Sequence, residues 1–132
     1  MTKFTHLHLH TQYSILDGAS KIKEIMEKAV ADGMPAVAIT DHGNMIGVKD
    51  FWDQAKKNKI KPILGIETYV AANGRSVMEK GKGNRGYHLI LLAKNKTGYK
   101  NLMKLSSIAF TEGFYYNARI DHELLEQYHE GL

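Results

Sequence analysis

The sequence predicts an α/β fold, in which short apolar strands alternate with amphipathic helices. Two observations lead to this class. Residues 36–40 form a compact apolar run, which is typical of a buried parallel strand, and apolar side chains recur at helical spacing on both sides of it. The full order reads β-α-β-α-β-β-α-α, which favours a mainly parallel sheet or barrel. With 132 residues, the chain has the length of one ordinary domain.

The first strand and helix are expected within residues 4–33. Apolar and polar side chains alternate over residues 4–11, which places Leu7 and Leu9 on one face and three histidines on the other, as in a strand. Ser20 is expected to cap a helix that stops at Gly33. Its apolar stripe consists of Ile22, Ile25, Met26, Ala29 and Val30.

Three further strands and three helices complete the predicted order. The strand at residues 36–40 leads into a helix with one apolar stripe, and strands follow at residues 63–70 and 87–93. Residues 72–86 are rich in glycine and charge and predict an irregular or flexible insertion. A helix is expected over residues 99–110, and Asp121 is expected to cap a last one. The stripe of the second helix comprises Val48, Phe51, Trp52 and Ala55, and the last helix contains Leu124, Leu125 and Tyr128.

Composition limits the chemistry. The chain contains no cysteine, so any metal must be held by nitrogen and oxygen ligands, and a cytoplasmic location is expected. No apolar run approaches the length of a membrane span or an export signal. The net charge of +4 is weak evidence for nucleic acid, because many basic residues fall in a lysine-rich helix end and in the insertion.

Histidines and carboxylates follow the predicted strands at positions that suit a metal centre. His8 and His10 share a strand face, Asp17 follows that strand, Asp41 and His42 follow the second, and Glu67 lies in the third. Active sites gather at the carboxyl ends of parallel strands, and so many charged groups are costly to desolvate without a cation. Such ligands suit Zn²⁺, Mn²⁺ or Fe²⁺ and the hydrolysis of phosphoesters.

Each candidate also has a simpler interpretation. Asp17 precedes a glycine and suits a turn, and Glu67 suits an ion pair with a lysine. His6 is expected to be buried or to support the ligands, and the position of His88 at the start of its strand favours a core histidine. Two histidines, His122 and His129, are expected to be exposed. The aromatic run Phe114, Tyr115 and Tyr116 suits base stacking, but also a core or a partner surface.

Longer motifs resemble a known family. Residues 4–18 contain FTHLHLHTQYSILDG, and ITDHG follows at residues 39–43. These segments resemble the PHP (polymerase and histidinol phosphatase) family. Residues 60–70, 87–95 and 112–116 are similar to the N-terminal PHP domain of bacterial DNA polymerase III alpha subunits.

The resemblance implies a distorted seven-stranded β/α barrel with a polynuclear metal site. Residues 1–132 would form the N-terminal portion of a single PHP domain, truncated before the last strands and later ligands. Zn²⁺ or Mn²⁺ is expected, with two or three ions in a complete domain. Asp41 would support the ligands or face the substrate as the catalytic residue. The metal ligands would be His8, His10, Asp17, His42, Glu67 and His88.

Three functions compete at this stage. The first is a part of a replicative polymerase whose PHP domain hydrolyses phosphoesters, including as a 3′–5′ exonuclease that assists proofreading. The second is a non-catalytic module that docks a proofreading subunit, and the third is a free-standing phosphatase such as histidinol phosphatase. DNA and other replicase subunits are the expected partners. Exposed strand edges of an unfinished barrel also predict self-association or a rearranged C-terminus, and the isolated fragment is expected to be inactive.

Overall fold

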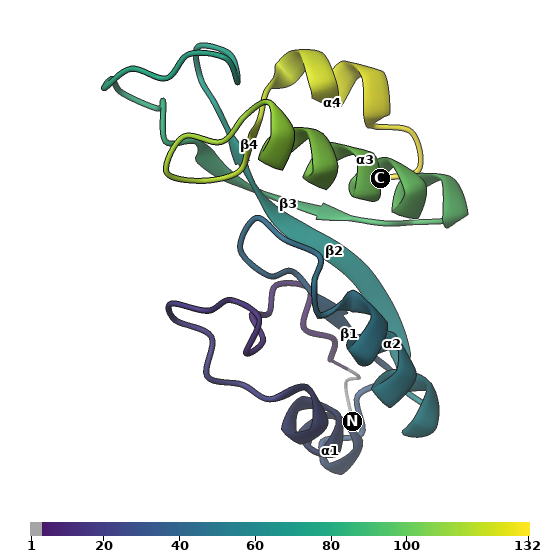
Figure 1. Cartoon of the computed structure of the whole chain (residues 1–132). Coiled ribbons are helices and arrows are strands. Elements are labelled where there is room, and N and C mark those ends of the chain that lie inside the picture. The colour runs from purple at the N-terminus through teal and green to yellow at the C-terminus, as the bar shows by residue number, and fades with distance from the viewer. Residues whose placement is uncertain (1–3) are drawn as a thin grey trace.

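The structure is a computed structural model that describes residues 4–132 (Figure 1). Helices and strands alternate along the described chain except where β3 follows β2 directly. No helix among the described residues is long and apolar enough to cross a membrane. The elements in chain order are α1 (Ile22–Ala31), β1 (Ala36–Ile39), α2 (Val48–Lys57), β2 (Lys61–Val70), β3 (Tyr87–Leu92), α3 (Lys96–Thr111), β4 (Arg119–Ile120) and α4 (His122–Tyr128).

Strand β2 is the central strand of the sheet and runs the length of the molecule (Figure 1). Parallel β1 pairs with its first residues and parallel β4 with its last two. Antiparallel β3 pairs with β2 over residues 65–70. The α/β class is therefore confirmed, and two of the three strand pairings are parallel, as a mainly parallel sheet requires. Strand β3 is the antiparallel exception, because the insertion between β2 and β3 lets the chain turn back. The sheet of the described residues is open, so a closed barrel stays a prediction.

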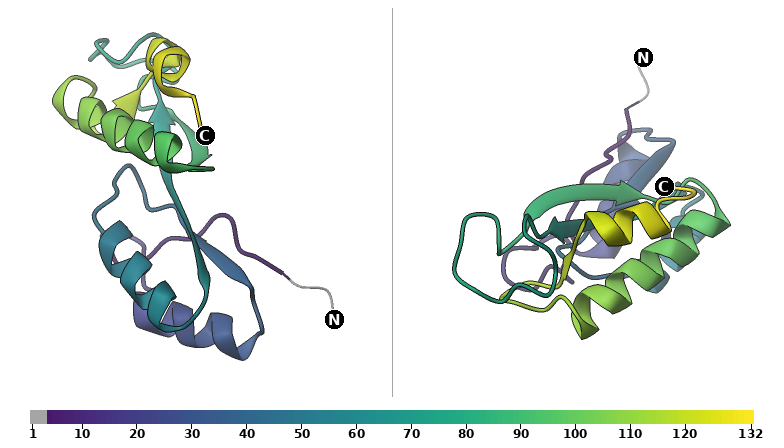
Figure 2. Two further views of the ribbon diagram at one scale, coloured as in Figure 1. Left: turned by 90° about the vertical axis from the view of Figure 1, so that its right-hand side faces the viewer. Right: turned by 90° about the horizontal axis from the view of Figure 1, so that it is seen from above.

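Two hydrophobic clusters lie at opposite ends of β2. At one end, α1 and α2 pack on β1 through buried side chains that include Met26, Phe51 and Ile39. At the other end, α3 and α4 lie side by side (Figure 2) and bury Leu105 and Ile120. The chain therefore forms two lobes that share one strand. Two side chains expected in buried stripes, Val30 and Trp52, are 50% and 43% exposed.

Residues 6–9 run beside β1 but do not form the expected strand. The His6 carbonyl accepts a hydrogen bond from Ala38 N, and the Leu9 carbonyl accepts one from Thr40 N. The N-terminal segment therefore advances by three residues where the neighbouring chain of β1 advances by two. This extra residue interrupts the ladder as a bulge does. Ser20 is not the cap of α1 either. The N-cap is Lys21, and the side-chain oxygen of Gln12 accepts from the backbone N–H of Ile22.

The insertion at residues 72–86 is irregular, as expected, but it is tied to the sheet by Arg119. This side chain is completely buried. Its guanidinium donates hydrogen bonds to four backbone carbonyls, three of which belong to the insertion. The carbonyls are those of Arg75, Val77, Asn84 and Gly113.

Candidate metal centre

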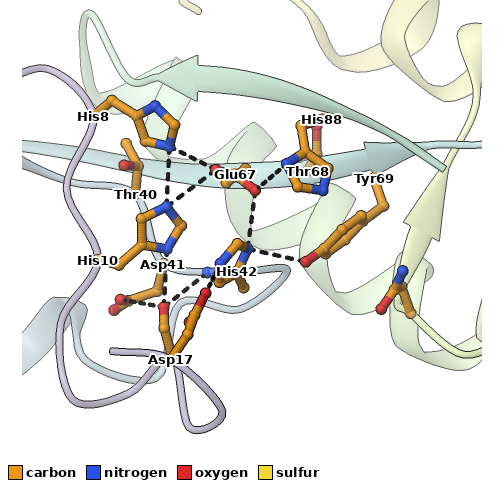
Figure 3. Close-up of polar contacts among 12 residues, drawn as sticks. His8, His10, Asp17, Thr40, Asp41, His42, Glu67, Thr68, Tyr69 and His88 are labelled. Atoms are coloured by element: carbon orange, nitrogen blue, oxygen red, sulfur yellow. Dashed lines mark hydrogen bonds and ion pairs between the residues drawn. The ribbon is translucent and has the colours of Figure 1, made fainter. Parts of the chain in front are cut away.

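A buried carboxylate, Glu67, stands at the centre of the site. Its backbone N–H donates to Asp41 O, and its carbonyl accepts from Gly43 N, so the loop after β1 is fixed against the middle of β2. Its side chain is only 1% exposed. Figure 3 shows four imidazole rings turned toward it, from His8, His10, His42 and His88.

Two histidines of the N-terminal segment meet one oxygen of this carboxylate. Nε2 of His8 lies 2.6 Å from Glu67 Oε2, and Nε2 of His10 lies 3.1 Å from the same oxygen. The two ring nitrogens are 3.0 Å apart. All three atoms lie within 4.8 Å of one another, which is close enough to surround one ion.

The other carboxylate oxygen faces the remaining histidines. Nδ1 of His42 lies 2.9 Å from Glu67 Oε1, and Nδ1 of His88 lies 2.7 Å from it. On its far side, His42 Nε2 is 3.0 Å from Asp17 Oδ2. Glu67 thus bridges two groups of ligand-type atoms, and Asp17 extends the second group toward solvent.

Hydrogen bonds around Ser14 fix the tautomer of His10. The Ser14 hydroxyl donates to Asp41 Oδ1 and accepts from His42 N, so toward His10 Nδ1 it can act only as an acceptor. The proton of a neutral His10 ring is therefore on Nδ1, and the lone pair of Nε2 points to Glu67 and His8. This arrangement prepares an imidazole for metal binding.

Asp41 itself is buried and saturated. One oxygen accepts from Thr11 N and Ser14 Oγ, and the other accepts from Thr11 Oγ1. The side chain is part of a residue that is 1% exposed, so in this structure it organises the loop and does not face the open side of the cluster. The catalytic role expected for Asp41 stays a prediction, and the geometry favours its supporting role.

The donor set fits divalent cations. Glu67 Oε1 is buried and has no hydrogen-bond partner among the described residues, although two ring nitrogens lie within 3 Å of it. The Tyr69 hydroxyl lies 2.9 Å from His42 Nδ1, so this ring nitrogen faces two oxygens. A buried carboxylate oxygen without a hydrogen-bond donor is unfavourable unless a cation lies beside it.

Electrostatics keep Glu67 ionised. Burial by itself raises the pKa of its carboxyl, but the hydrogen bond with His8 and electrostatic attraction toward His42, His88 and His10 outweigh that effect, so the pKa is lowered. The pKa of Tyr69 is raised, first by burial and then by the charges of Glu67 and Asp17. Tyr69 therefore keeps its proton and remains a donor near neutral pH.

The structure brings together all six residues that the sequence singled out as ligands, although their role as ligands remains a prediction. His88 is exposed and beside Glu67, so its interpretation as a core histidine is wrong. Antiparallel pairing places His88 opposite Tyr69, on the face that carries Glu67. His6 is also exposed and lies outside the cluster, contrary to expectation, whereas His122 and His129 are exposed as expected.

Three supporting residues were missed by the sequence interpretation, namely Thr11, Ser14 and Tyr69. Tyr69 is two residues from Glu67 in the same strand, so the sequence could have predicted that both side chains lie on one face. Thr11 and Ser14 carry no such signal, because their contacts with Asp41 arise only when the loop packs on the end of β1.

Comparison with known proteins agrees with this geometry. The family model described as "PHP domain" matches residues 6–132. The chain belongs to the PHP domain family. Curated relatives of this PHP chain include the DNA polymerase III alpha subunits of Borreliella burgdorferi, at 53% identity over 99% of the chain, and of Thermus aquaticus, at 48% over 98%. The chain spans only 12% and 11% of those proteins, respectively.

Solved structures share the PHP fold at lower identity. A candidate metal-dependent phosphoesterase from Bifidobacterium adolescentis matches with a TM-score of 0.59 and 18% identity, over 83% of this chain and 34% of that one. An amidohydrolase from Chromobacterium violaceum, with bound sulfate and no metal, matches with a TM-score of 0.57 and 24% identity, over 80% and 33%. These likenesses concern the fold.

Proposed function

We propose that this chain is the N-terminal portion of the PHP domain of a DNA polymerase III alpha subunit, and that its cluster hydrolyses phosphoesters with divalent metal ions. The observation that carries the proposal is the convergence of four imidazoles on one buried, ionised carboxylate. The names of the relatives support a DNA polymerase III alpha subunit as the parent protein. The Bifidobacterium neighbour supports metal-dependent hydrolysis of phosphoesters as the reaction class. In the parent, the four strands would belong to a distorted seven-stranded barrel.

His8, His10 and Glu67 would hold one ion, and the second group around Glu67 would hold another, with Zn²⁺ or Mn²⁺ as the ions that suit these ligands. Bound ions of this kind activate water and neutralise phosphoryl oxygens. The chain's own residues position the ligands: Ser14 directs the lone pair of His10, and the Tyr69 hydroxyl lies within hydrogen-bond distance of His42 Nδ1. Asp17, at the exposed edge of the cluster, is placed where a phosphoester would approach.

In the parent protein we propose DNA as the substrate, in a cytoplasmic replicase with further subunits as partners. The domain would trim 3′ ends and so assist proofreading, while polymerisation takes place elsewhere in the parent.

A docking role for a proofreading subunit is the second candidate, and a specific surface favours it. An open groove of about 850 Å³ lies between α2 and the start of α3, with Leu7, Trp52 and Ile63 among its apolar lining residues. Lysines stand along it, including Lys49 and Lys94. An open, largely apolar groove of this size, with lysines along it, suits a protein surface better than a small substrate.

Mn²⁺ binding by this chain and nuclease activity of the complete parent protein on 3′-ended single-stranded DNA test the proposal together. In Glu67→Gln, the bridging charge is lost, so we expect Mn²⁺ affinity to fall at least tenfold and any Mn²⁺-dependent nucleotide release to disappear. Glu126→Gln, at an exposed position of α4, should retain both. Bound Mn²⁺ without activity would favour the docking role. Activity that survives in Glu67→Gln would contradict the proposed site.

A further inference from the structure

A second pocket adjoins the metal cluster. It has a volume of about 560 Å³ and shares Asp17, His42 and Tyr69 with the cluster. Its other walls come from the loop that contains Ile15 and from the segment between α3 and β4. A molecule bound at the ligands from this side could therefore extend into this pocket.

Several large apolar and aromatic side chains of the pocket walls are exposed. Phe110 and Phe114 are 49% and 52% exposed, and their rings stack at 6.3 Å. Tyr116 is 58% exposed on the same side, and across the pocket Ile15 and Leu16 are almost wholly exposed. A cluster of exposed large apolar side chains marks a binding surface. Aromatic faces in particular suit a flat, unsaturated ring.

A cation is fixed at the rim of this pocket. The guanidinium of Arg85 lies 4.4 Å from the centre of the Tyr116 ring. Asn117, which lines the pocket, donates from its side-chain nitrogen to the carbonyl of Arg85 and so ties this residue to the rim.

The Tyr116 backbone has a φ of +61°, a left-handed conformation that is unfavourable for a bulky side chain and that often accompanies a functional position. An aromatic wall, an arginine beside it and an adjoining metal cluster match the base, the phosphate backbone and the scissile phosphate of a nucleic acid.

We propose that this pocket is a base subsite, in which Phe114 and Tyr116 stack on the terminal base of a nucleotide whose phosphate lies at the cluster. This inference rests on the proposed function and names the substrate part that the neighbouring pocket receives. Arg85 contacts the phosphate of the adjoining nucleotide. Since stacking tolerates any base, the subsite selects nucleotides over other phosphoesters without selecting a sequence.

Calorimetric titration of the chain in Mn²⁺ tests the subsite with two probes, deoxyadenosine 5′-monophosphate and 2-deoxyribose 5-phosphate. We expect the nucleotide to bind about tenfold more tightly, as one base–aromatic stack provides. Phe114→Ala should remove this preference and leave the affinity for the sugar phosphate unchanged. Phe4→Ala, which removes a ring that is 59% exposed outside the pocket, should change neither affinity.

Equal affinities for the two probes, or a preference that Phe114→Ala leaves intact, would overturn the base subsite. The aromatic wall would then be a surface for a protein partner. Mn²⁺ binding on the same samples, read by electron paramagnetic resonance, tests the proposed function separately. Bound Mn²⁺ with no base preference contradicts only the subsite, and a base preference without bound Mn²⁺ supports the subsite and contradicts the metal centre.

Discussion

The position of one proton on His10 decides which of its nitrogens serves the cluster. Ser14 holds that proton on Nδ1 because its own hydrogen goes to Asp41. The buried carboxylate of Asp41 thus influences the His10 ring through the hydroxyl of Ser14, which lies between them. Such supporting residues commonly contribute one to two orders of magnitude to metal affinity.

Asp41→Asn should therefore weaken Mn²⁺ binding by about tenfold to a hundredfold, because an amide cannot accept all three hydrogen bonds. The affinity can be measured by titration with electron paramagnetic resonance detection. Asp53→Asn, at an exposed ion pair of α2, is the control and should have no effect. If Asp41 acted only on the substrate, hydrolysis would fall in the variant while Mn²⁺ affinity stayed at the wild-type value.

At the site, the sequence predicted which residues gather but not how they are arranged. The spacing of His8 and His10, and the position of His42 directly after a buried strand, are local signals. The approach of His88 depends on an antiparallel pairing across the insertion, and such long-range geometry has no trace in local spacing. The support from Ser14 is invisible for the same reason.

At the scale of elements, Arg119 on the short strand β4 organises the insertion. Arg119→Met keeps much of the volume but leaves the four carbonyls without this donor. We expect the free energy of unfolding to fall by about 3 kcal/mol, measured in urea, with faster proteolysis within residues 72–86. Lys80→Met, at an exposed position of the same segment, should change stability little. A loss below about 1 kcal/mol would show that the insertion folds without this anchor.

Asp121 joins the start of α4 to Arg75. It caps the helix by accepting from Leu124 N, and it also accepts from the Arg75 backbone and guanidinium. Burial by itself raises the pKa of Asp121, but these contacts outweigh it and lower the pKa. A carboxyl with a lower pKa in the folded state stabilises the fold above its unfolded pKa, and that stability is lost as pH falls through the folded pKa.

Asp121→Asn should thus cost about 2 kcal/mol of the free energy of unfolding at pH 7, and less as the pH falls below about 4. Urea unfolding of both proteins across this range measures the difference. Asp53→Asn, whose exposed ion pair is worth little, should differ from wild type by less than about 0.5 kcal/mol throughout. An Asp121→Asn deficit that stays constant with pH would assign the stabilisation to packing and not to charge.

Some helices and strands could be predicted from local sequence, and others depend on tertiary structure. The helices α1, α2 and α4 and the buried strand β1 follow from local periodicity, and their predicted positions are confirmed. The strand expected at residues 4–11 fails because one extra residue opposes β1 between His6 and Leu9. Strand β4 has only two residues, and it was missed because its pairing with β2 is set by tertiary structure alone.

At the scale of the whole molecule, two lobes share β2 and leave an apolar groove between α2 and the start of α3. The sheet of the described residues is open, so its edge strands can pair with the strands of another chain. The groove can also bind the apolar surface of another chain. We expect self-association to use the groove between α2 and the start of α3.

Sedimentation across a range of concentrations should show association of the wild-type chain. Trp52→Glu places a charge in the groove and should shift the protein toward the monomer, with an association constant reduced at least tenfold (about 1.4 kcal/mol). Met103→Glu, on the exposed side of α3, is the control because Met103 is 41% exposed and lies outside the groove. A wild-type chain that stays monomeric at all concentrations would contradict this prediction.

The central claim is that Glu67 and its four histidines surround metal ions. An anomalous-scattering map from crystals grown with Mn²⁺ tests it most directly. We predict a peak within about 2.3 Å of His8 Nε2, His10 Nε2 and Glu67 Oε2, and a second beside Glu67 Oε1. A map with ordered side chains and no peak at Glu67, or with metal only elsewhere, would contradict the account.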